Sequence, residues 1–115
     1  MTARPTHDVL PGTLELLILR NLSLESMHGW SIGQRIQQLS DEVLQVGQGS
    51  LYPALQRLEQ KGWIDSEWKA TEQNRRAKYY HLTPLGRRSL SEELNSWRGY
   101  VSAVEMILQG SLRPA

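Results

Sequence analysis

The stretch SLYPALQRLEQKG, at residues 50–62, predicts the helix around which the rest of the fold is arranged. Ser50 offers a hydroxyl that can cap free backbone N–H groups at a helix start, and Pro53 would fall in the first turn, where its missing N–H breaks no intrahelical bond. Gly62 follows Lys61 and suits the position just past a helix end. Between them, one stripe at helical spacing would face a core: Leu51, Leu55 and Leu58.

Two further helices are predicted before this stretch. Thr13 is a candidate N-cap, and a helix from there to about Ser23 would bury one apolar stripe: Leu14, Leu17, Ile18 and Leu22. After a short breaker at 26–29, a second stripe continues to about Ser40: Ile32, Ile36 and Leu39. Residues 45–49 contain two glycines and no stripe, so we expect a loop there.

After Gly62 the periodicity changes from helical to alternating. Alternating side chains indicate two strands: Ile64, Ser66 and Trp68 in the first, Tyr80 and Leu82 in the second. The polar residues 71–76 separate them, which predicts a hairpin with a polar tip. Thr83 and Pro84 then suit an N-cap followed by proline at the first helical position, opening a long helix that continues to about Gln109.

This order of elements is that of a winged helix-turn-helix, a mainly α fold with a small β-wing, followed by a long C-terminal dimerisation helix. A chain of 115 residues suits one compact domain. We expect its segments to be a flexible N-terminal arm at 1–9, a winged-helix DNA-binding domain at 10–83, the dimerisation helix at 84–109 and a tail at 110–115.

Apolar residues along the long C-terminal helix recur in alternating steps of four and three, which is typical of a coiled-coil seam. The seam consists of Leu90, Leu94, Trp97, Val101, Val104 and Leu108. Three short helices cannot cover so long a stripe, so a second copy is the expected partner. The predicted homodimer interface comprises Leu94, Trp97, Val101, Val104 and Leu108. Trp97 could act as a packing anchor or as a flat wall for a planar ligand.

The helix at 50–62 and the hairpin tip together predict a DNA-binding surface. Once its leucines are buried, the helix leaves one face exposed: Tyr52, Pro53, Gln56, Arg57 and Gln60. In a helix-turn-helix such residues meet base edges in the major groove, although they could equally be ordinary solvated side chains. The hairpin tip adds Arg75, Arg76 and Lys78, which can contact phosphates or enter a minor groove.

Charge and composition narrow the function classes. The net charge is only +1, but residues 57–88 hold eight basic and four acidic residues, so positive charge is concentrated on the predicted DNA-binding part. The absence of cysteine excludes disulfide frameworks, zinc fingers and thiol nucleophiles. No apolar run is long enough to span a membrane, and no secretory signal pattern is present. A cytoplasmic protein without membrane contact is expected.

No pattern indicates catalysis. His7, His28 and His81 are scattered, and no metalloprotease motif, nucleophile elbow or glycine-rich phosphate loop occurs. We therefore expect no enzyme, no cofactor and no metal. His28 is interpreted as a turn or cap residue. Three tryptophans are expected to pack in the core or the wing: Trp30, Trp63 and Trp68.

Three stretches closely resemble the PadR family of bacterial transcriptional regulators: HGWSI at 28–32, GSLYPALQRLE at 49–59 and RRAKYYHLT at 75–83. The resemblance extends from about Leu10 to Leu108, and the length and single C-terminal helix resemble the short subfamily. Three positions depart from the family pattern. Trp30 replaces the common tyrosine, Asn74 stands where glycine is frequent, and Ala77 replaces a frequent basic residue.

The resemblance implies a winged-helix homodimer that binds double-stranded operator DNA with sequence specificity. Such regulators usually act as repressors on a pseudo-palindromic operator, and some release it when a small aromatic or cationic ligand binds. By position, the DNA-binding residues would be Ser50, Tyr52, Pro53, Gln56 and Arg57 from the helix, with Arg75, Arg76 and Lys78 from the wing. Trp97 matches a tryptophan that lines a hydrophobic pore at the dimer centre of multidrug-binding members.

Two other function classes stay open from the residues alone. A winged-helix protein–protein adaptor would use Tyr52 and Trp68 as contact anchors. A small-molecule sequestering protein would hold its ligand at Trp97 and bind DNA little. A steep loss of DNA affinity with salt would distinguish a DNA-binding regulator from both.

Overall fold

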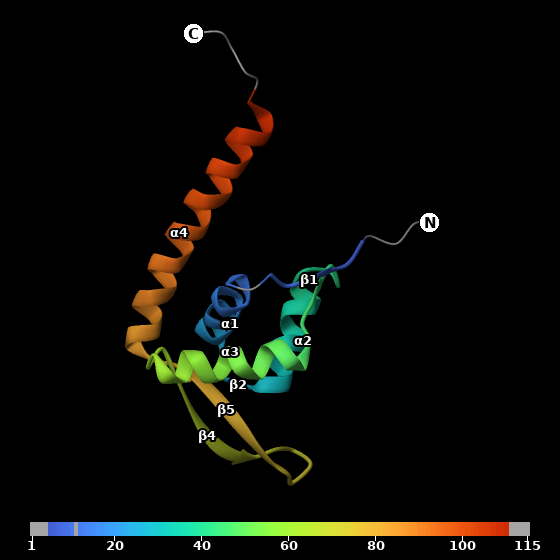
Figure 1. The fold of residues 1–115 in the computed structure, drawn as a ribbon. Helices are drawn as coiled ribbons and strands as arrows, with labels where there is room; N and C mark the ends of the chain where they lie inside the picture. Colours follow the sequence, from blue (N-terminus) through green and yellow to red (C-terminus); the bar gives the residue numbers. More distant parts are fainter. Residues whose placement is uncertain (1–4, 11, 111–115) are drawn as a thin grey trace.

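The computed structural model describes residues 5–10 and 12–110, and within them the chain forms four helices and two small sheets (Figure 1). The helices are α1 (Thr13–Leu24), α2 (Gly29–Leu39), α3 (Gln48–Gln60) and α4 (Pro84–Gln109). The strands are β1 (His7–Asp8), β2 (Met27–His28), β3 (Leu44–Gln45), β4 (Ile64–Ala70) and β5 (Arg76–Leu82). The winged helix-turn-helix with a long C-terminal helix, expected from the sequence, is confirmed.

The wing is an antiparallel hairpin of β4 and β5, in register from Ile64 opposite Leu82 to Ala70 opposite Arg76. Strand β2 pairs with the other edge of β5, so the sheet has the order β2-β5-β4. The sequence did not predict β2, because two residues are too few to show an alternating pattern. Its pairing ties the start of α2 to the base of the wing.

The N-terminal segment is held more closely than the expected flexible arm. Strand β1 pairs in parallel with β3, and the His7 N–H donates to the Val43 carbonyl at 2.8 Å. This short pairing lies inside the segment at 1–9 that was expected to be mobile throughout. Residues 1–4 of that arm, and 111–115 of the expected tail, lie outside the described residues.

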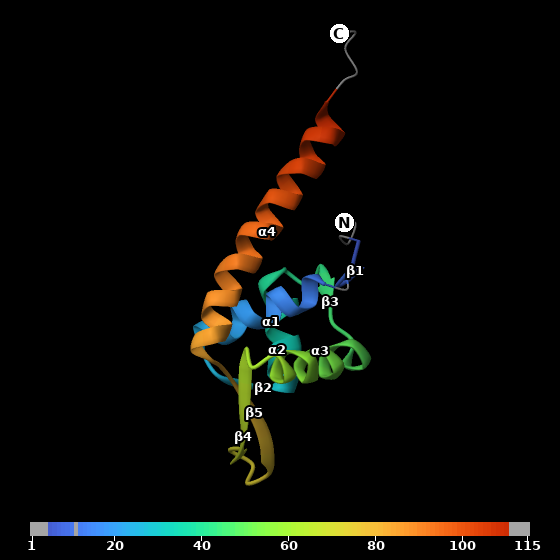
Figure 2. The same cartoon turned by 60° about the vertical axis from the view of Figure 1, so that its left-hand side comes forward.

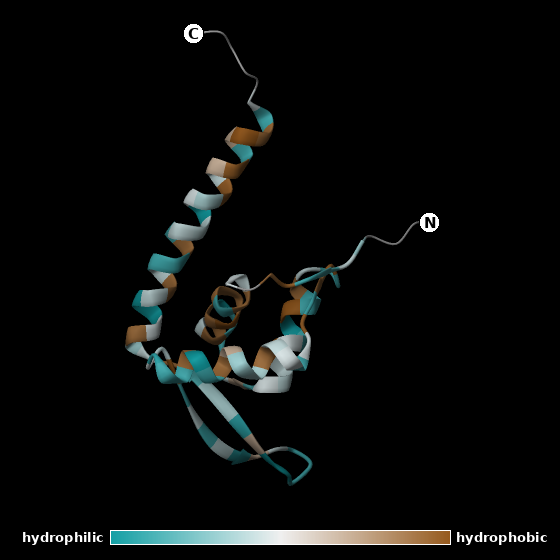
Figure 3. Cartoon of the chain, in the orientation of Figure 1, coloured by the Kyte–Doolittle hydropathy of each residue, from teal (hydrophilic) through white to brown (hydrophobic). Residues whose placement is uncertain are grey.

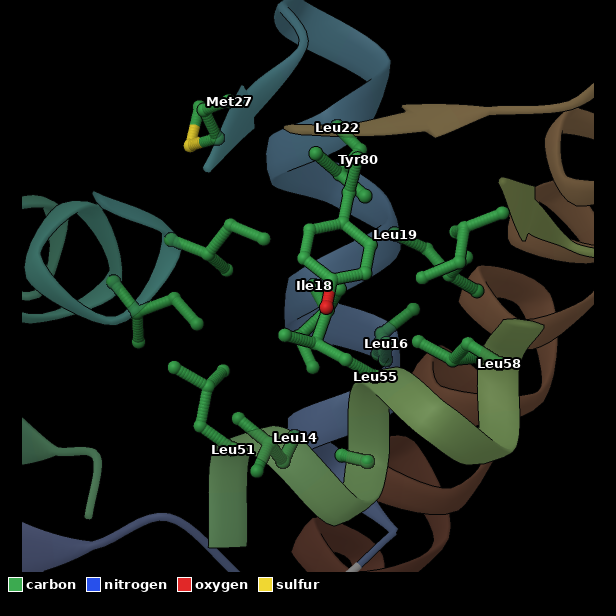
Figure 4. Packing of buried hydrophobic residues seen from close by; sticks show 14 of the residues in the cluster. Leu14, Leu16, Ile18, Leu19, Leu22, Met27, Leu51, Leu55, Leu58 and Tyr80 are labelled. Carbon is green, nitrogen blue, oxygen red and sulfur yellow. The ribbon is translucent and has the colours of Figure 1, made fainter. Parts of the chain in front are cut away.

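The core lies where α1 meets the other elements of the winged-helix part (Figure 4). Its fully buried side chains come from α1, α2, α3 and β4: Ile18, Leu19, Ile32, Leu55, Leu58 and Ile64. Tyr80 points from β5 into the same cluster. Each of the predicted apolar stripes of the first three helices contributes to this core, although Leu17 is only half-buried and Leu39 is exposed.

Two helix starts differ from their predicted caps, because a glycine occupies the cap position in each. Gly12, with φ of 84° in the left-handed region that glycine tolerates, precedes α1, so Thr13 is already helical. Gly47 precedes α3 and its carbonyl accepts the Leu51 N–H at 3.0 Å. Ser50 is therefore inside the first turn and caps nothing. Pro53 falls in the second turn, where it removes the N–H that would bond the Gly49 carbonyl.

The end of α3 and the start of α4 follow their sequence signals and meet at one junction. Gly62 has φ of 75°, and its N–H and that of Trp63 donate to the carbonyls of Glu59 and Leu58, which closes α3. The Thr83 hydroxyl accepts the Gly86 N–H at 3.0 Å, as predicted for an N-cap. The same hydroxyl lies 2.7 Å from the Gly62 carbonyl, so it joins the two helix ends.

Only the first turns of α4 pack on the core. Leu90 is buried and Leu94 packs against the core from its edge, whereas the rest of the helix projects beyond the domain (Figures 1 and 2). Hydropathy colouring shows that apolar bands continue along this projecting part (Figure 3). The wing protrudes on the opposite side of the domain from the free end of α4.

Alkaline pH is expected to destabilise the fold through Tyr80. Burial, reinforced by the negative charge of Glu59, raises the pKa of the Tyr80 phenol above its ordinary value. The folded state therefore favours the neutral phenol, and this contribution is present below the unfolded pKa of about 10 and is lost as the pH rises through the folded pKa. We expect Tyr80→Phe to lose less thermal stability than the wild type between pH 7 and alkaline pH. Tyr100→Phe, at an exposed tyrosine, is the control; equal losses in wild type and Tyr80→Phe would contradict the prediction.

Candidate nucleic-acid interface

The outward side of α3 carries every residue that the sequence assigned to DNA from this helix. All five are exposed: Ser50, Tyr52, Pro53, Gln56 and Arg57. Their neighbours Leu51, Leu55 and Leu58 are buried, because helical spacing turns these side chains towards α1 and the core. Pro53, Gln56 and Gln60 follow the middle of the exposed face, with Tyr52 and Arg57 at its two edges.

Arg57 marks the edge of this face beside α1. Its Nε donates to Glu15 Oε1 at 2.7 Å, and Lys61 Nζ lies 3.4 Å from the other oxygen of the same carboxylate. The Glu15 side chain is largely covered, whereas that of Arg57 is about half exposed. Glu15 therefore orients Arg57 from a neighbouring helix. Sequence reasoning missed it, since no local pattern connects residues 42 positions apart.

Tyr52 marks the opposite edge, beside the wing. A side-chain carbon added to Gly29 would lie only 3.0 Å from the Tyr52 ring, so glycine at the start of α2 allows this ring to pack there. Glu59, two helical turns further along α3, accepts from the Ser66 hydroxyl at 3.0 Å and lies 3.2 Å from Lys78 Nζ. Glu59 thus ties α3 to the wing and partly neutralises Lys78.

The wing tip presents Arg75 and Arg76 to solvent. The Thr71 N–H donates to the Arg75 carbonyl at 2.6 Å, and the Asn74 N–H donates back to Thr71 at 2.9 Å. Asn74 has φ of 60°, in the left-handed region that asparagine tolerates best after glycine. Its replacement of the family's frequent glycine therefore leaves the tip conformation intact.

Two of the three tryptophans expected to be buried are exposed. Trp63 packs against the core, as predicted. Trp30 is 54% exposed and Trp68 is 59% exposed, so the packing prediction is wrong for both. Trp30 opens the first turn of α2 and Trp68 lies on β4, opposite Lys78, where the wing has left the core. Both rings border the α3 face.

The long helix keeps most of its predicted seam uncovered. Trp97 is 38% exposed and Leu108 is 72% exposed, with Val101 also exposed and Val104 half-buried. Leu94 differs, because it already packs on the domain's own core. The Trp97 ring also stacks with Tyr100 at 6.4 Å between centroids, which the heptad pattern did not include.

Cavities flank Trp97 on two sides. One, of about 360 Å³, is mostly apolar and lies between the ring, Leu44 and residues 7–10. The other, of about 190 Å³, lies between the ring, Leu16 and Tyr100. Trp97 is therefore the shared wall of two hollows near the N-terminus of α1.

The histidines have separate contacts in the described part of the chain. His28 occupies the N-cap position of α2, in agreement with its predicted role, and its Nε2 lies 2.9 Å from the Ser31 hydroxyl. His81 lies between Ser26, at 2.7 Å, and Glu67, at 2.9 Å, on the wing. This Ser-His-Glu contact joins the α1–β2 turn to the wing, and none of its members borders the cavities at Trp97.

A family model described as the transcriptional regulator PadR-like family matches residues 18–92. The chain belongs to this family. Among its relatives, a transcriptional regulator from Mycobacterium tuberculosis is 36% identical over 83 residues, which cover 71% of this chain and 73% of the relative. A solved PadR-like regulator from Bacillus cereus is 32% identical with a TM-score of 0.73, covering 87% of this chain and 95% of that chain. A PadR family regulator from Eggerthella lenta is 31% identical with a TM-score of 0.73, covering 87% and 85%.

Membership of the PadR-like family makes the chain a DNA-binding regulator of transcription. Regulators of this family are generally not enzymes. Within residues 5–10 and 12–110, no helix combines the length and the apolar character needed to cross a membrane.

Proposed function

We propose that the protein is a cytoplasmic homodimeric repressor that binds a pseudo-palindromic operator with sequence specificity. The observation that carries the proposal is the pairing of two uncovered surfaces on one chain. The exposed face of α3 lies beside a basic wing, and the apolar side of α4 projects away from both. Two copies joined through α4 would present two α3 helices, one for each half-site.

In this proposal α3 reads the major groove and the wing contacts the flanking backbone. Gln56 and Arg57 have donors that can reach base edges, and Ser50, Tyr52 and Pro53 border the same face. Arg75, Arg76 and Lys78 supply phosphate contacts from the wing. The Glu15–Arg57 ion pair supports a fixed direction for the Arg57 side chain in the absence of DNA.

Dimerisation through α4 is supported by the side chains that the protomer leaves uncovered. The proposed interface consists of Leu94, which also packs on the protomer's own core, and the more open Trp97, Val101, Val104 and Leu108. Exposed aromatic and aliphatic residues in such a stripe indicate a protein interface rather than a solvated face. Ile107 adds exposed apolar surface next to Leu108 near the end of α4, whereas Met106 is exposed on the side of the helix away from the seam.

An effector site at Trp97 forms part of the proposal. The cavities on both sides of its ring lie beside the proposed dimer seam, where a small aromatic or cationic ligand could stack on the indole. Glu93 borders one of them and provides a negative charge for a cation. A ligand that prefers one dimer geometry would change the spacing of the two α3 helices and thereby release the operator.

The proposal is tested by fluorescence-anisotropy titration against DNA from upstream of the protein's own gene and a scrambled duplex, at two salt concentrations. Tighter binding to the upstream DNA would support a self-regulating operator protein. The same titration with a small aromatic cation added reports release. If the protein binds neither duplex in a salt-sensitive way, the proposal is contradicted, and an adaptor or a ligand-sequestering protein is favoured.

Removing the wing arginines is expected to weaken DNA binding and its salt dependence together. Each phosphate contact contributes about 0.9 to the slope of log K against log salt, so Arg75→Ala with Arg76→Ala should lower that slope by about 2. Affinity should fall at least about tenfold at low salt. Arg20→Ala with Arg98→Ala, which removes the same charge from α1 and α4, is the matched control. Equal slopes for the two double variants would show that the two wing arginines make no phosphate contact.

A further inference from the structure

Exposed aromatic side chains gather between the wing and the start of α2. A cavity of about 390 Å³ is lined by Trp30, Tyr52, Trp68 and Lys78, among others. A second, of about 510 Å³, shares Trp30 and extends to Arg75 and Arg76 at the wing tip. We call the two together the wing groove; its lining residues are His28, Gly29, Trp30, Tyr52, Trp68, residues 71–73, and residues 75–80.

The groove exists because β2 is so short. Its two residues pair only with Tyr79 and Tyr80, after which the chain turns into α2 at Gly29. The edge of β5 from Arg76 to Lys78 is therefore unpaired among the described residues, and the first turn of α2 faces it. The groove leads from this edge directly to Tyr52 on the exposed face of α3.

Both tryptophans of the groove are exposed and yet held in place. Trp30 stacks on His28 with 6.3 Å between ring centroids and an angle of 16°. Trp68 has the Arg76 guanidinium 5.7 Å from its ring. Neighbouring large apolar side chains left open to water in this way indicate a binding surface, and here the rings are arranged before any partner arrives.

The charges around the groove select an anionic partner. Arg75, Arg76 and Lys78 line it, and Glu72 is the acidic side chain among the lining residues. Lys78 is partly neutralised by Glu59, so the two arginines supply most of the positive charge. Gly29 and Trp30, the first two residues of α2, line the groove, so the positive end of this helix borders it. In the described part of the chain no side chain caps this end. A partner that suits the whole lining must offer anionic oxygens to the cations and carbon surface to the rings. The backbone of DNA does both, through its phosphates and its deoxyriboses.

We infer that the wing groove holds the sugar–phosphate backbone of a duplex strand beside the α3 face, with Trp30 and Trp68 as uncharged contacts. The indole N–H groups can donate to phosphate oxygens, and the rings can pack on deoxyribose. This inference rests on the proposed DNA-binding function and adds two contact residues to it. Since the sugar–phosphate backbone is the same in every DNA sequence, the groove contributes affinity for DNA and not sequence preference.

The test is the affinity of full-length Trp30→Ala and Trp68→Ala for a random-sequence duplex at low salt, measured over several salt concentrations. We expect each variant to bind about fivefold to tenfold more weakly, as for the loss of one or two neutral contacts. The slope of log K against log salt should stay at the wild-type value, because no cation is removed. Trp30→Phe, which keeps a ring but lacks the N–H, should lie between Trp30→Ala and wild type.

Leu39→Ala is the matched control, since it truncates an exposed apolar residue at the other end of α2. Thermal melting of all variants establishes that they are folded. Wild-type affinity in both tryptophan variants would overturn the inference while leaving the proposed function in place, whereas failure of the wild type to bind any duplex would overturn both. Tighter wild-type binding to the single strand than to the duplex would also overturn the inference, because the groove would then stack bases.

Discussion

Gly86→Ala is expected to lower the free energy of unfolding by about 3 kcal/mol, near the upper end for overpacking in a well-packed site. A side-chain carbon at this position would overlap the Trp63 carbonyl oxygen and come within 2.8 Å of Leu82 Cδ1. The carbonyl cannot move aside freely, because it accepts the Thr83 N–H at 3.1 Å and lies 3.0 Å from the Thr83 hydroxyl. The variant must therefore open the junction that joins the end of α3 to the start of α4.

Urea unfolding at a fixed protein concentration measures this loss, with Gly99→Ala as the matched control. Gly99 lies on the same helix, and no described atom outside its own helix would come within 4 Å of an added side-chain carbon. Alanine is the better helix former, so Gly99→Ala should stabilise by up to about 1 kcal/mol. Similar stabilities for the two variants would mean that the junction tolerates the added carbon.

Val101→Asp is expected to convert the protein to a monomer and to reduce operator affinity on the order of a hundredfold. Val101 lies in the middle of the proposed seam, between Trp97 and Val104, and is exposed in the protomer. A carboxylate at the centre of a dimer interface loses its hydration without gaining a partner, at a cost of several kcal/mol. Loss of the second α3 helix then removes half of the proposed operator contacts.

Size-exclusion chromatography with light scattering gives the oligomeric state, and the anisotropy titration gives the affinity. Ser102→Asp introduces the same charge one residue later, on a side of α4 outside the seam, and should remain dimeric. Because Val101 lies beyond the core of the protomer, circular dichroism should show Val101→Asp to be folded. A dimeric Val101→Asp would place the interface elsewhere.

The sequence predicted the fold best where the interactions join residues that are close together in the chain. Signals that act within a few residues are found where the sequence indicated. They are the helical stripes in α1, α2 and α3, the glycine after α3, and Thr83-Pro84 before α4. The prediction that Ser50 caps α3 is wrong, although helix capping is equally local. Gly47, three residues earlier in the chain, adopts the extended cap conformation, so the helix begins at Gln48 and Ser50 is already inside it.

In the candidate site, too, the features set by local spacing were predictable and the contacts between distant elements were not. Helical spacing alone was sufficient to predict that Gln56 and Arg57 are exposed while Leu55 is buried. The Glu15 carboxylate that holds Arg57, and the Glu59 carboxylate that holds Lys78, come from contacts between elements distant in sequence. No periodicity encodes such contacts, because they depend on how the elements pack.

By itself, the sequence determined the order of the helices, the wing and the long apolar seam, since local spacing and capping decide which residues become helix or strand. Only the tertiary structure decided that Trp30 and Trp68 stand open beside the wing. Tryptophan is normally buried, and its exposure here follows from the early end of β2 and from the departure of β4 from the core. Burial is a property of the assembled neighbours of a side chain, and these neighbours are brought together only by packing.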